Sequence, residues 1–375
     1  MSPPSSPEPC RVLVIGGYGF FGRRLVERLS SQPGLHIVVA GRSAAQAAAL
    51  VDELRPTARA SLASVALDAL SDDLPAALGQ LQVRAVVHTS GPFQGQDFRV
   101  AQACVAAGVH YVDLADGRAF VGAIGAVDAA ARAAGVCVLG GASSVPALSA
   151  AAADALTQGW QRVDAIDMGI SPGNRTERGL STVRAVLSYC GRPIAHADGV
   201  SLTGWLRLRL RRYPAPVGWR PLSPCDVPDL DLMPSRYPGR PVVRFGAGLE
   251  LLWLHLGANA MALVGRLGLV RDWAVHAPWL KRWSDRLAAF GTDAGAMHVT
   301  ARGLDAQGRP ARRTWTLVAT HGDGPWVPTL AAAALVRKLA EGATPAAGAR
   351  PCVGELGLDD FARETSGLHI GWTVD

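Results

Sequence analysis

A cluster of glycines directly after an apolar run constrains the fold of this chain more than any other feature. Residues 12–29 read VLVIGGYGFFGRRLVERL, and the G-x-G-x-x-G pattern is matched by Gly17, Tyr18, Gly19, Phe20, Phe21 and Gly22. In this pattern the first glycine permits a tight turn, the second lets the backbone approach a pyrophosphate, and the third lets helix and strand pack closely. The helix N-terminus then offers unpaired N–H groups to the phosphates. The stretch therefore predicts a dinucleotide-binding strand–turn–helix unit.

Further apolar runs follow the glycine turn at the spacing of alternating strands and helices. We expect strands at 11–16, 35–41, 64–68, 85–91, 109–115 and 135–141, with helical patterns between them. Strands that alternate with helices form a parallel sheet that is covered on both faces. Residues 11–145 are therefore predicted to be an α/β domain with a doubly wound parallel sheet, a Rossmann domain.

The residues after the second predicted strand indicate which dinucleotide the turn would bind. An NAD site usually has an Asp or Glu about twenty residues past the last glycine, where it holds the ribose 2′-hydroxyl. This chain has Arg42 and Ser43 there, and an arginine can hold a 2′-phosphate by charge-assisted hydrogen bonds. We therefore expect NADP rather than NAD. Asp68, which ends the third predicted strand, is placed to contact the adenine edge or, equally, to cap the next element.

The sequence pattern changes after about residue 145. We expect strands at 163–171, 182–190, 204–212, 240–245, 297–305 and 312–320, and the last two are joined by a short loop typical of a hairpin. These runs predict a second α+β domain with a mostly antiparallel sheet over 146–327. A final segment, 328–375, opens with one helix at 328–342.

Composition narrows the class of protein. The formal charge is +6 and the pI is near 9.3, but the basic residues are scattered, so no nucleic-acid partner is expected. The six cysteines show no CxxC pair and the histidines no metal-ligand spacing. We therefore expect reduced thiols, no metal site and a cytoplasmic location. Residues 1–10 are rich in Pro and Ser and are expected to form a disordered tail rather than a signal peptide.

Two common chemistries are excluded by the sequence. The glycine turn is similar to that of short-chain dehydrogenases, but none of the five tyrosines has a lysine four residues on, so the Tyr-x-x-x-Lys pair of those enzymes is absent. The stretch from Gly141 to Val145 does not match the G-x-S-x-G pattern of serine hydrolases.

Several stretches together resemble the saccharopine dehydrogenase-like family. They are GGYGFFG, AGRS, HTSGPFQGQDFRVAQACVAAGVHYVDLADG at 88–117 and GASSVPALS at 141–149, and the resemblance continues more weakly through 167–194. The resemblance implies an NADP-binding Rossmann domain, a sheet-containing substrate and dimerisation domain, a homodimer, and a C-terminal segment, 328–375, that packs back on the Rossmann domain. Members of the family act on amino-acid imines, polyamine precursors or lipid enoyl groups, so the small-molecule substrate stays open.

The resemblance also points to site residues at the carboxyl ends of the predicted strands, where open α/β sheets bind their ligands. Near the nicotinamide we expect Ser90, Gly91, Pro92 and Phe93. The candidates for proton transfer are Asp113, Tyr111, Ser143 and Ser144, because the chain has no lysine before residue 281. The candidate substrate ligands are Asn174, Arg175 and Arg178.

An apolar stretch at 249–270 has two interpretations. As a helix it would place Leu256 and Leu263 on one face with other apolar side chains, and His255, Asn259 and Arg266 on another. Such a helix packs in a core or dimer interface, or it lies at a lipid surface with the tryptophans and basic residues that follow up to 283. The uncharged run is too short to span a bilayer.

Two functions remain open from the sequence. The first is an NADP-dependent oxidoreductase that transfers hydride to or from a C=N, C=O or conjugated C=C bond. The second is an NADP(H)-binding module without turnover, acting in redox sensing or at a membrane surface, because no familiar catalytic dyad is present.

Overall fold

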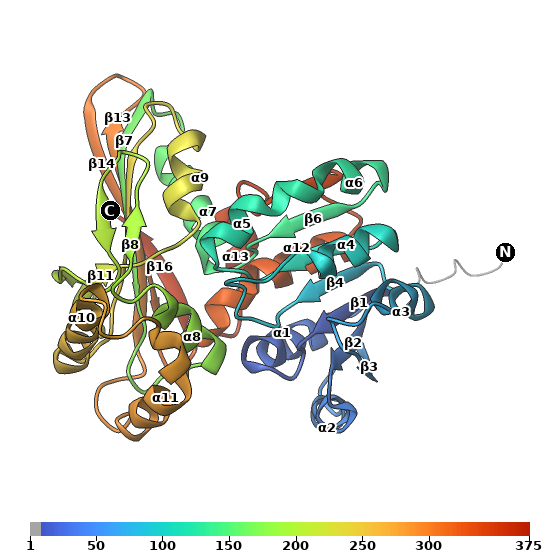
Figure 1. Cartoon of the computed structure of the whole chain (residues 1–375). Coiled ribbons are helices and arrows are strands. Elements are labelled where there is room, and N and C mark those ends of the chain that lie inside the picture. Colours follow the sequence, from blue (N-terminus) through green and yellow to red (C-terminus); the bar gives the residue numbers. More distant parts are fainter. Residues whose placement is uncertain (1–8) are drawn as a thin grey trace.

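The computed structural model describes residues 9–375, and two seven-stranded sheets dominate it (Figure 1). All strand pairs of the first sheet are parallel, in the order β15-β6-β5-β4-β1-β2-β3. The predicted doubly wound sheet is confirmed, with one strand more than expected. Its strands are β1 (Cys10–Ile15), β2 (Leu35–Gly41), β3 (Ser61–Ala66), β4 (Ala85–His88), β5 (His110–Asp113), β6 (Cys137–Gly140) and β15 (Gly348–Pro351).

Helices cover both faces of this sheet, so successive strand residues enter different cores. Val12 and Val14 pack with α1 and α2, whereas Leu13 and Ile15 pack with α3 and α4. This two-sided burial explains why the strand sequences are continuous apolar runs. The helices are α1 (Phe20–Ser30), α2 (Ala44–Leu54), α3 (Leu74–Leu81), α4 (Arg99–Ala106), α5 (Arg118–Ala123) and α6 (Asp128–Ala133).

The second sheet is mixed, in the order β10-β11-β12-β7-β13-β14-β16. Only β12 and β7 pair in parallel, so the predicted, mostly antiparallel sheet is confirmed. Its strands are β7 (Arg162–Ser171), β10 (Arg209–Arg212), β11 (Trp219–Pro224), β12 (Val242–Ala247), β13 (Gly295–Leu304), β14 (Pro310–Ala319) and β16 (Ile370–Val374). A hairpin and four helices accompany it: β8 (Pro193–Ala195), β9 (Ser201–Thr203), α8 (Leu180–Ser188), α9 (Asp229–Arg236), α10 (Leu252–Arg266) and α11 (Ala277–Arg286).

Two alanine-rich helices join the sheets. α7 (Ser149–Thr157) and α12 (Leu330–Ala340) lie between them, and α13 (Leu358–Glu364) packs beside α12. The alanines at 150–153 and 331–334 are at most 2% exposed. They belong to one continuous core that includes Val12 of the first sheet and Trp315 of the second. Small side chains at these positions let helices and sheets approach closely, so the two domains share a core.

The C-terminal segment differs from the expectation. Residues 328–375 do not pack on the Rossmann domain alone: β15 extends the first sheet, whereas β16 pairs with β14 in the second. The chain therefore crosses between the domains three times. Of the expected tail at 1–10, residues 1–8 lie outside the described residues, and Cys10 already belongs to β1.

Two predicted strands of the second domain are also wrong. Residues 182–190 lie largely in helix α8, because a short apolar run with no clear period does not distinguish a half-buried helix from a strand. The run at 204–212 forms a strand only from Arg209, since Trp205 and Arg207 adopt left-handed backbone conformations that interrupt it.

Three further properties concern cysteines, metals and membranes. All six cysteines are buried and free of disulfides. Residues 9–375 contain no cluster of three or more His, Cys, Asp or Glu side chains that could hold a metal ion. Within the same range, none of the helices combines the length and apolarity that crossing a bilayer requires.

The alanine-rich layer generates a first prediction. Replacing Ala333 by Leu in α12 should lower the free energy of unfolding by about 1–3 kcal/mol, because the added atoms have no space between α12 and its neighbours. Ala130→Leu, at an exposed position of α6, is the matched control and should change stability little. Equal stability of both variants in chemical denaturation would contradict the close packing of the layer.

A buried carboxyl group connects α9 to the same layer. Asp229 is fully buried, its Oδ1 accepts a hydrogen bond from Ser149 Oγ in α7, and its Oδ2 has no partner among the described residues. Burial raises the pKa of Asp229 to about 6. The folded protein therefore binds this proton more tightly than the unfolded chain does. The stability that the group contributes is complete below pH ~4 and is lost as the pH rises through about 6.

Asp229→Asn should remove this loss, because the amide stays neutral at every pH. We expect the variant to gain up to ~3 kcal/mol in unfolding free energy over the wild type near pH ~8, and the gain to shrink toward zero at pH ~4. Asp359→Asn, at an exposed carboxylate, is the control and should track the wild type. Denaturant unfolding as a function of pH measures the difference, and a pH-independent difference would contradict the assignment.

Candidate nucleotide and active site

The glycine turn lies between β1 and α1, and it is a tight turn, as the sequence predicts. Gly19 is in extended conformation directly before the helix, and the first turn of α1 contains no acidic residue. A Cβ atom added at Gly22 would overlap the carbonyl oxygen of Gly16. Gly16, with φ +76°, is the residue in the left-handed region, and a Cβ there would strike Ser90. The turn therefore needs Gly16 as well as the predicted Gly17, Gly19 and Gly22.

Tyr18 connects the glycine turn to the end of β2. The backbone N–H of Ser43 donates to Tyr18 Oη at 2.9 Å, and the Tyr18 ring occupies the space that a Cβ at Gly41 would need. Ser43 also caps α2 by accepting from the Gln46 N–H at 3.3 Å. Arg42 is exposed beside them, and no carboxylate within residues 9–375 pairs with it. The structure thus brings Tyr18, Arg42 and Ser43 together at one end of the turn.

Phe20 and Phe21, the two aromatic residues of the turn, begin α1 and pack edge to face with ring centroids 4.9 Å apart. Asp68 lies farther along the edge of the sheet, in the loop after β3. It is exposed, and its carboxylate accepts from the Leu70 N–H at 3.0 Å. This bond is that of a turn residue, and the N-cap of the next helix, α3, is Asp73, so the capping role expected for Asp68 is wrong.

The loop after β4 is held by side chains on both sides. Gln96 Nε2 donates to the carbonyl oxygens of Ser90 at 2.9 Å and Pro92 at 2.7 Å. Ser181 of α8 donates to the Gly91 carbonyl at 3.0 Å, so a second-domain residue contacts this loop. Phe93 is different: it is buried in a small cluster, with its ring centroid 5.4 Å from that of Phe120. Phe93 therefore packs in the protein interior, where it supports the loop.

Asp113 and Tyr111, at the end of β5, are completely enclosed. Asp113 Oδ1 accepts from the N–H groups of Ala115 at 2.9 Å and Gly141 at 2.7 Å, which joins the ends of β5 and β6. Burial raises the pKa of Asp113 to about 6. Tyr111 Oη lies 3.2 Å from His88 Nδ1, and burial lowers the pKa of His88 to about 4, so this histidine is neutral at pH 7. Asp113, Tyr111 and His88 therefore stabilise this edge of the sheet from the protein interior.

Ser143 and Ser144 follow β6 and are both buried. Ser144 Oγ has no hydrogen-bond partner among the described residues. A short turn, Ser144–Leu148, in which Val145 has non-helical backbone angles, follows them and leads into α7. The serines therefore lie where the first domain meets the alanine-rich layer.

Residues 174–181 of the second domain, a loop that ends in the first residues of α8, cross the mouth of the glycine turn, and we call them loop 174–181. Arg24 of α1 forms an ion pair with Glu177 at 3.2 Å, and Gly179 lies so close to the Phe20 ring that a Cβ there would be 3.1 Å from it. With the Ser181–Gly91 hydrogen bond, these contacts join both domains across the crevice. The carboxyl ends of the parallel strands thus face the second domain.

The three candidate substrate ligands of this loop are largely engaged elsewhere. Asn174 is buried, and its Nδ2 donates to the carbonyl oxygens of Leu287 at 2.8 Å and Phe290 at 2.7 Å. Arg178 donates to Ser284 Oγ at 3.2 Å, and burial lowers its pKa. Arg175 is exposed. Asn174 and Arg178 therefore hold the loop against α11 and its C-terminal extension.

Asp116 lies at the same edge of the sheet and is not among the residues that the sequence analysis expected there. It lies three residues past the end of β5, is partly exposed, and accepts from Gln94 Nε2 at 3.2 Å. Burial raises its pKa. In the second domain, Tyr189 Oη lies 2.9 Å from Cys225 Sγ. Both groups lie close enough to Asp116 for its charge to raise their pKa values. Its position at the carboxyl end of a parallel strand could have identified it.

Comparisons with known proteins agree with this geometry. Residues 12–139 match the model of the saccharopine dehydrogenase NADP binding domain, which confirms the resemblance over that range. A comparison with curated protein sequences finds no match. Among solved structures, apo saccharopine dehydrogenase (L-Glu forming) from Saccharomyces cerevisiae has a TM-score of 0.65 at 14% identity, covering 97% of this chain and 99% of that chain. The amine dehydrogenase from Mycobacterium smegmatis has a TM-score of 0.47 at 12% identity, covering 93% and 96%.

The family model covers the residues of the glycine turn. The likeness to the yeast enzyme extends over almost the whole chain, but it shows only the fold. Residues 12–139 are thus an NADP-binding domain of the saccharopine dehydrogenase type, in a chain whose overall fold is similar to that of saccharopine dehydrogenase.

Proposed function

We propose that the chain is an NADP-dependent oxidoreductase that transfers hydride to or from a C=N, C=O or conjugated C=C bond of a small molecule. One observation carries the proposal: loop 174–181 of the second domain lies across the glycine turn and the Gly91–Pro92 loop, where a nicotinamide would meet its substrate. The crevice is thus bounded by a nucleotide site on one side and a separate domain on the other.

The residues present fit NADP. The N–H groups at the start of α1 and the glycine turn would hold the pyrophosphate, and Arg42 would pair with the 2′-phosphate beside Tyr18 and Ser43. Ser90, Gly91 and Pro92 would border the nicotinamide. When bound, the cofactor supplies or accepts the hydride. The protein positions it, excludes water with the second domain and handles a proton.

For the proton we favour Asp116 over the residues expected from the sequence. Asp113 and Tyr111 are fully buried and already bonded within the sheet edge, and the serines at 143 and 144 are buried behind it. Asp116 is partly exposed, and burial raises its pKa, which favours its protonated form over that of a solvated aspartate. Arg175, exposed on the crossing loop, is the residue of that loop most free to meet a substrate.

The second candidate function is an NADP(H)-binding module without turnover. The contacts that close the crevice, Arg24–Glu177 and Ser181–Gly91, favour it, because they occupy the path by which a substrate would enter. Hydride transfer requires these contacts to open. A homodimer, expected from the family resemblance, is compatible with either function.

Nucleotide binding is tested by titrating the protein with NADPH and with NADH, following energy transfer from tryptophan to nicotinamide. Arg42→Ala should weaken NADPH binding by about 10- to 100-fold and leave NADH unchanged, because only NADPH has the 2′-phosphate. Arg312→Ala, at an exposed arginine of β14, is the matched control and should bind like the wild type. If NADPH binds no more tightly than NADH, the assignment of Arg42 is wrong.

Catalysis is tested with NADPH and a panel of imines, ketones and conjugated enones, following nicotinamide absorbance. Asp116→Asn should lower kcat at least about 100-fold with unchanged NADPH affinity. It should also abolish the fall in reduction rate as the pH rises through the raised pKa of Asp116.

Asp113→Asn, the comparison variant, should keep that pH profile, because Asp113 is enclosed in the edge of the sheet. Full turnover of Asp116→Asn would exclude Asp116 as the proton donor. Tight NADPH binding by a wild type that turns over no member of the panel would favour the binding module.

A further inference from the structure

Helix α10 is oriented opposite to a typical surface helix. Its polar side chains point inward: His255 is fully buried, with Nε2 2.9 Å from Ser223 Oγ, and Asn259 Nδ2 donates to the same hydroxyl at 3.1 Å. Its leucines point outward. The separation into two faces was expected from the sequence, but packing of the apolar face in the core of this chain is not what the structure shows. An outward helix face normally carries charged residues.

The apolar exposure continues through the following segment and α11. We call this surface the outer face, and its side chains are between 48% and 74% exposed: Leu252, Trp253, Leu256, Leu263, Leu267, Leu269, Val275, Trp279, Trp283 and Phe290. The ring centroids of Trp253 and Phe290 lie 6.5 Å apart, and Trp273 Nε1 donates to the Met261 carbonyl, so α10 contacts the segments that precede and follow α11. Figure 1 shows α10 on the side of the second domain away from the first sheet and α11 at the lower end of the domain, below α8.

Unpaired arginines surround the outer face. Residues 251–290 contain five Lys or Arg and two Asp. Lys281 pairs with Asp285, but no carboxylate within residues 9–375 pairs with Arg266, Arg271, Arg282 or Arg286. Arg286 lies over the Trp283 ring at 5.3 Å, an arrangement that leaves its charge at the surface. The outer face is therefore apolar with a cationic border.

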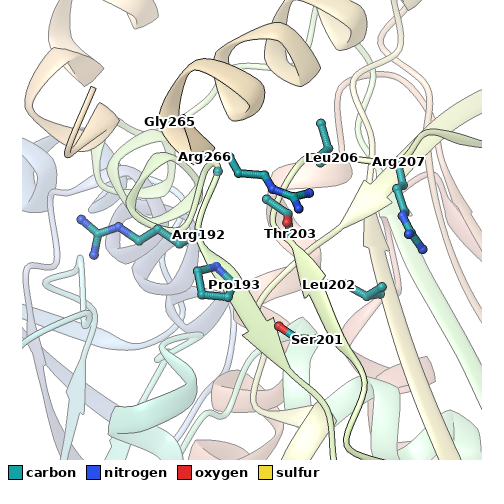
Figure 2. Close-up of a pocket in the computed structure, with 10 residues that line it drawn as sticks. Arg192, Pro193, Ser201, Leu202, Thr203, Leu206, Arg207, Gly265 and Arg266 are labelled. Atoms are coloured by element: carbon teal, nitrogen blue, oxygen red, sulfur yellow. The ribbon is translucent and has the colours of Figure 1, made fainter. Parts of the chain in front are cut away.

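A pocket of about 590 Å³ opens beside the end of α10 and extends this cationic border (Figure 2). It lies between Gly265–Arg266 and the β8–β9 hairpin. Arg266 reaches into it, and Arg192 and Arg207 stand at its two sides and point away from its centre. Neither of these two arginines is paired with a carboxylate in the described part of the chain.

An anionic lipid surface fits these observations better than a second copy of the chain. In a two-fold dimer the same patch meets itself, so the five basic residues of 251–290 would meet a surface that offers only two aspartates. An anionic bilayer instead offers negative headgroups to the arginines and an apolar interior to the leucines. Tryptophans such as Trp279 and Trp283 suit the boundary between these two layers.

We propose that the outer face docks the protein on the surface of a membrane that contains anionic phospholipid. α10 and α11 enter the headgroup boundary with their exposed leucines and tryptophans, and the bordering arginines pair with lipid phosphates. The docking is peripheral and does not depend on the proposed redox function.

The test is co-sedimentation of the full-length protein with vesicles. Equal parts of phosphatidylglycerol and phosphatidylcholine should bind it at least about tenfold more tightly than phosphatidylcholine alone, and added salt should weaken the binding. Leu256→Ser/Leu263→Ser should weaken it at least about tenfold, because two apolar contacts with the bilayer are lost. Arg271→Gln/Arg282→Gln should remove most of the preference for phosphatidylglycerol.

Leu70→Ser is the control, since this leucine is exposed in the first domain, after β3, and it should bind like the wild type. Circular dichroism and thermal unfolding confirm that all variants are folded. No binding to either vesicle overturns the proposal, and so does equal, salt-independent binding to both. A dimer in solution that dissociates on Leu256→Ser/Leu263→Ser would show that the outer face is an interface between copies, and would also overturn it.

Discussion

The close approach of two sheets through a layer of alanines is the constraint on which the rest of the structure depends. α7 and α12 lie between the sheets, and their alanines are at most 2% exposed. Larger side chains there would separate the sheets, because interiors are packed as densely as crystals. With alanine, Val12 of the first sheet and Trp315 of the second belong to one core. The domains are therefore parts of one packed body, although each has its own sheet.

This layer also determines where the candidate site forms. It holds the second domain against the carboxyl ends of the parallel strands, so loop 174–181 reaches α1 and the Gly91–Pro92 loop. The buried carboxylate of Asp113 defines the same edge from within, by accepting backbone N–H groups from the ends of β5 and β6. Asp116, three residues later, is left partly exposed between the domains. Two aspartates so close in sequence thus have different environments, because Asp113 is enclosed in the sheet and Asp116 lies partly exposed at its edge.

Burial also explains why the two faces of α10, in the second domain, have different surroundings. His255 and Asn259 satisfy Ser223 beneath α10, so the polar residues of that helix are used inside. The leucines are left outside, where burial in a lipid boundary would recover their apolar surface. A helix that is polar inward and apolar outward is stable only if its inward hydrogen bonds are made, and here they are. The apolar side chains of α10 are therefore exposed because its polar side chains make their hydrogen bonds with the core beneath the helix.

The sequence by itself determined the first sheet and its nucleotide turn, because both depend on local patterns. Apolar runs at regular spacing predict buried parallel strands, and glycines predict a turn that no larger residue can adopt. It also separated α10 into two faces correctly. Only the tertiary structure decided which face of α10 points inward, that β15 and β16 belong to different sheets, and that 182–190 is helical. It likewise decided that Asp113 is enclosed whereas Asp116 is accessible. These outcomes depend on contacts between residues far apart in the chain, such as Ser223 with His255 and Ser181 with Gly91, and no local period encodes such contacts.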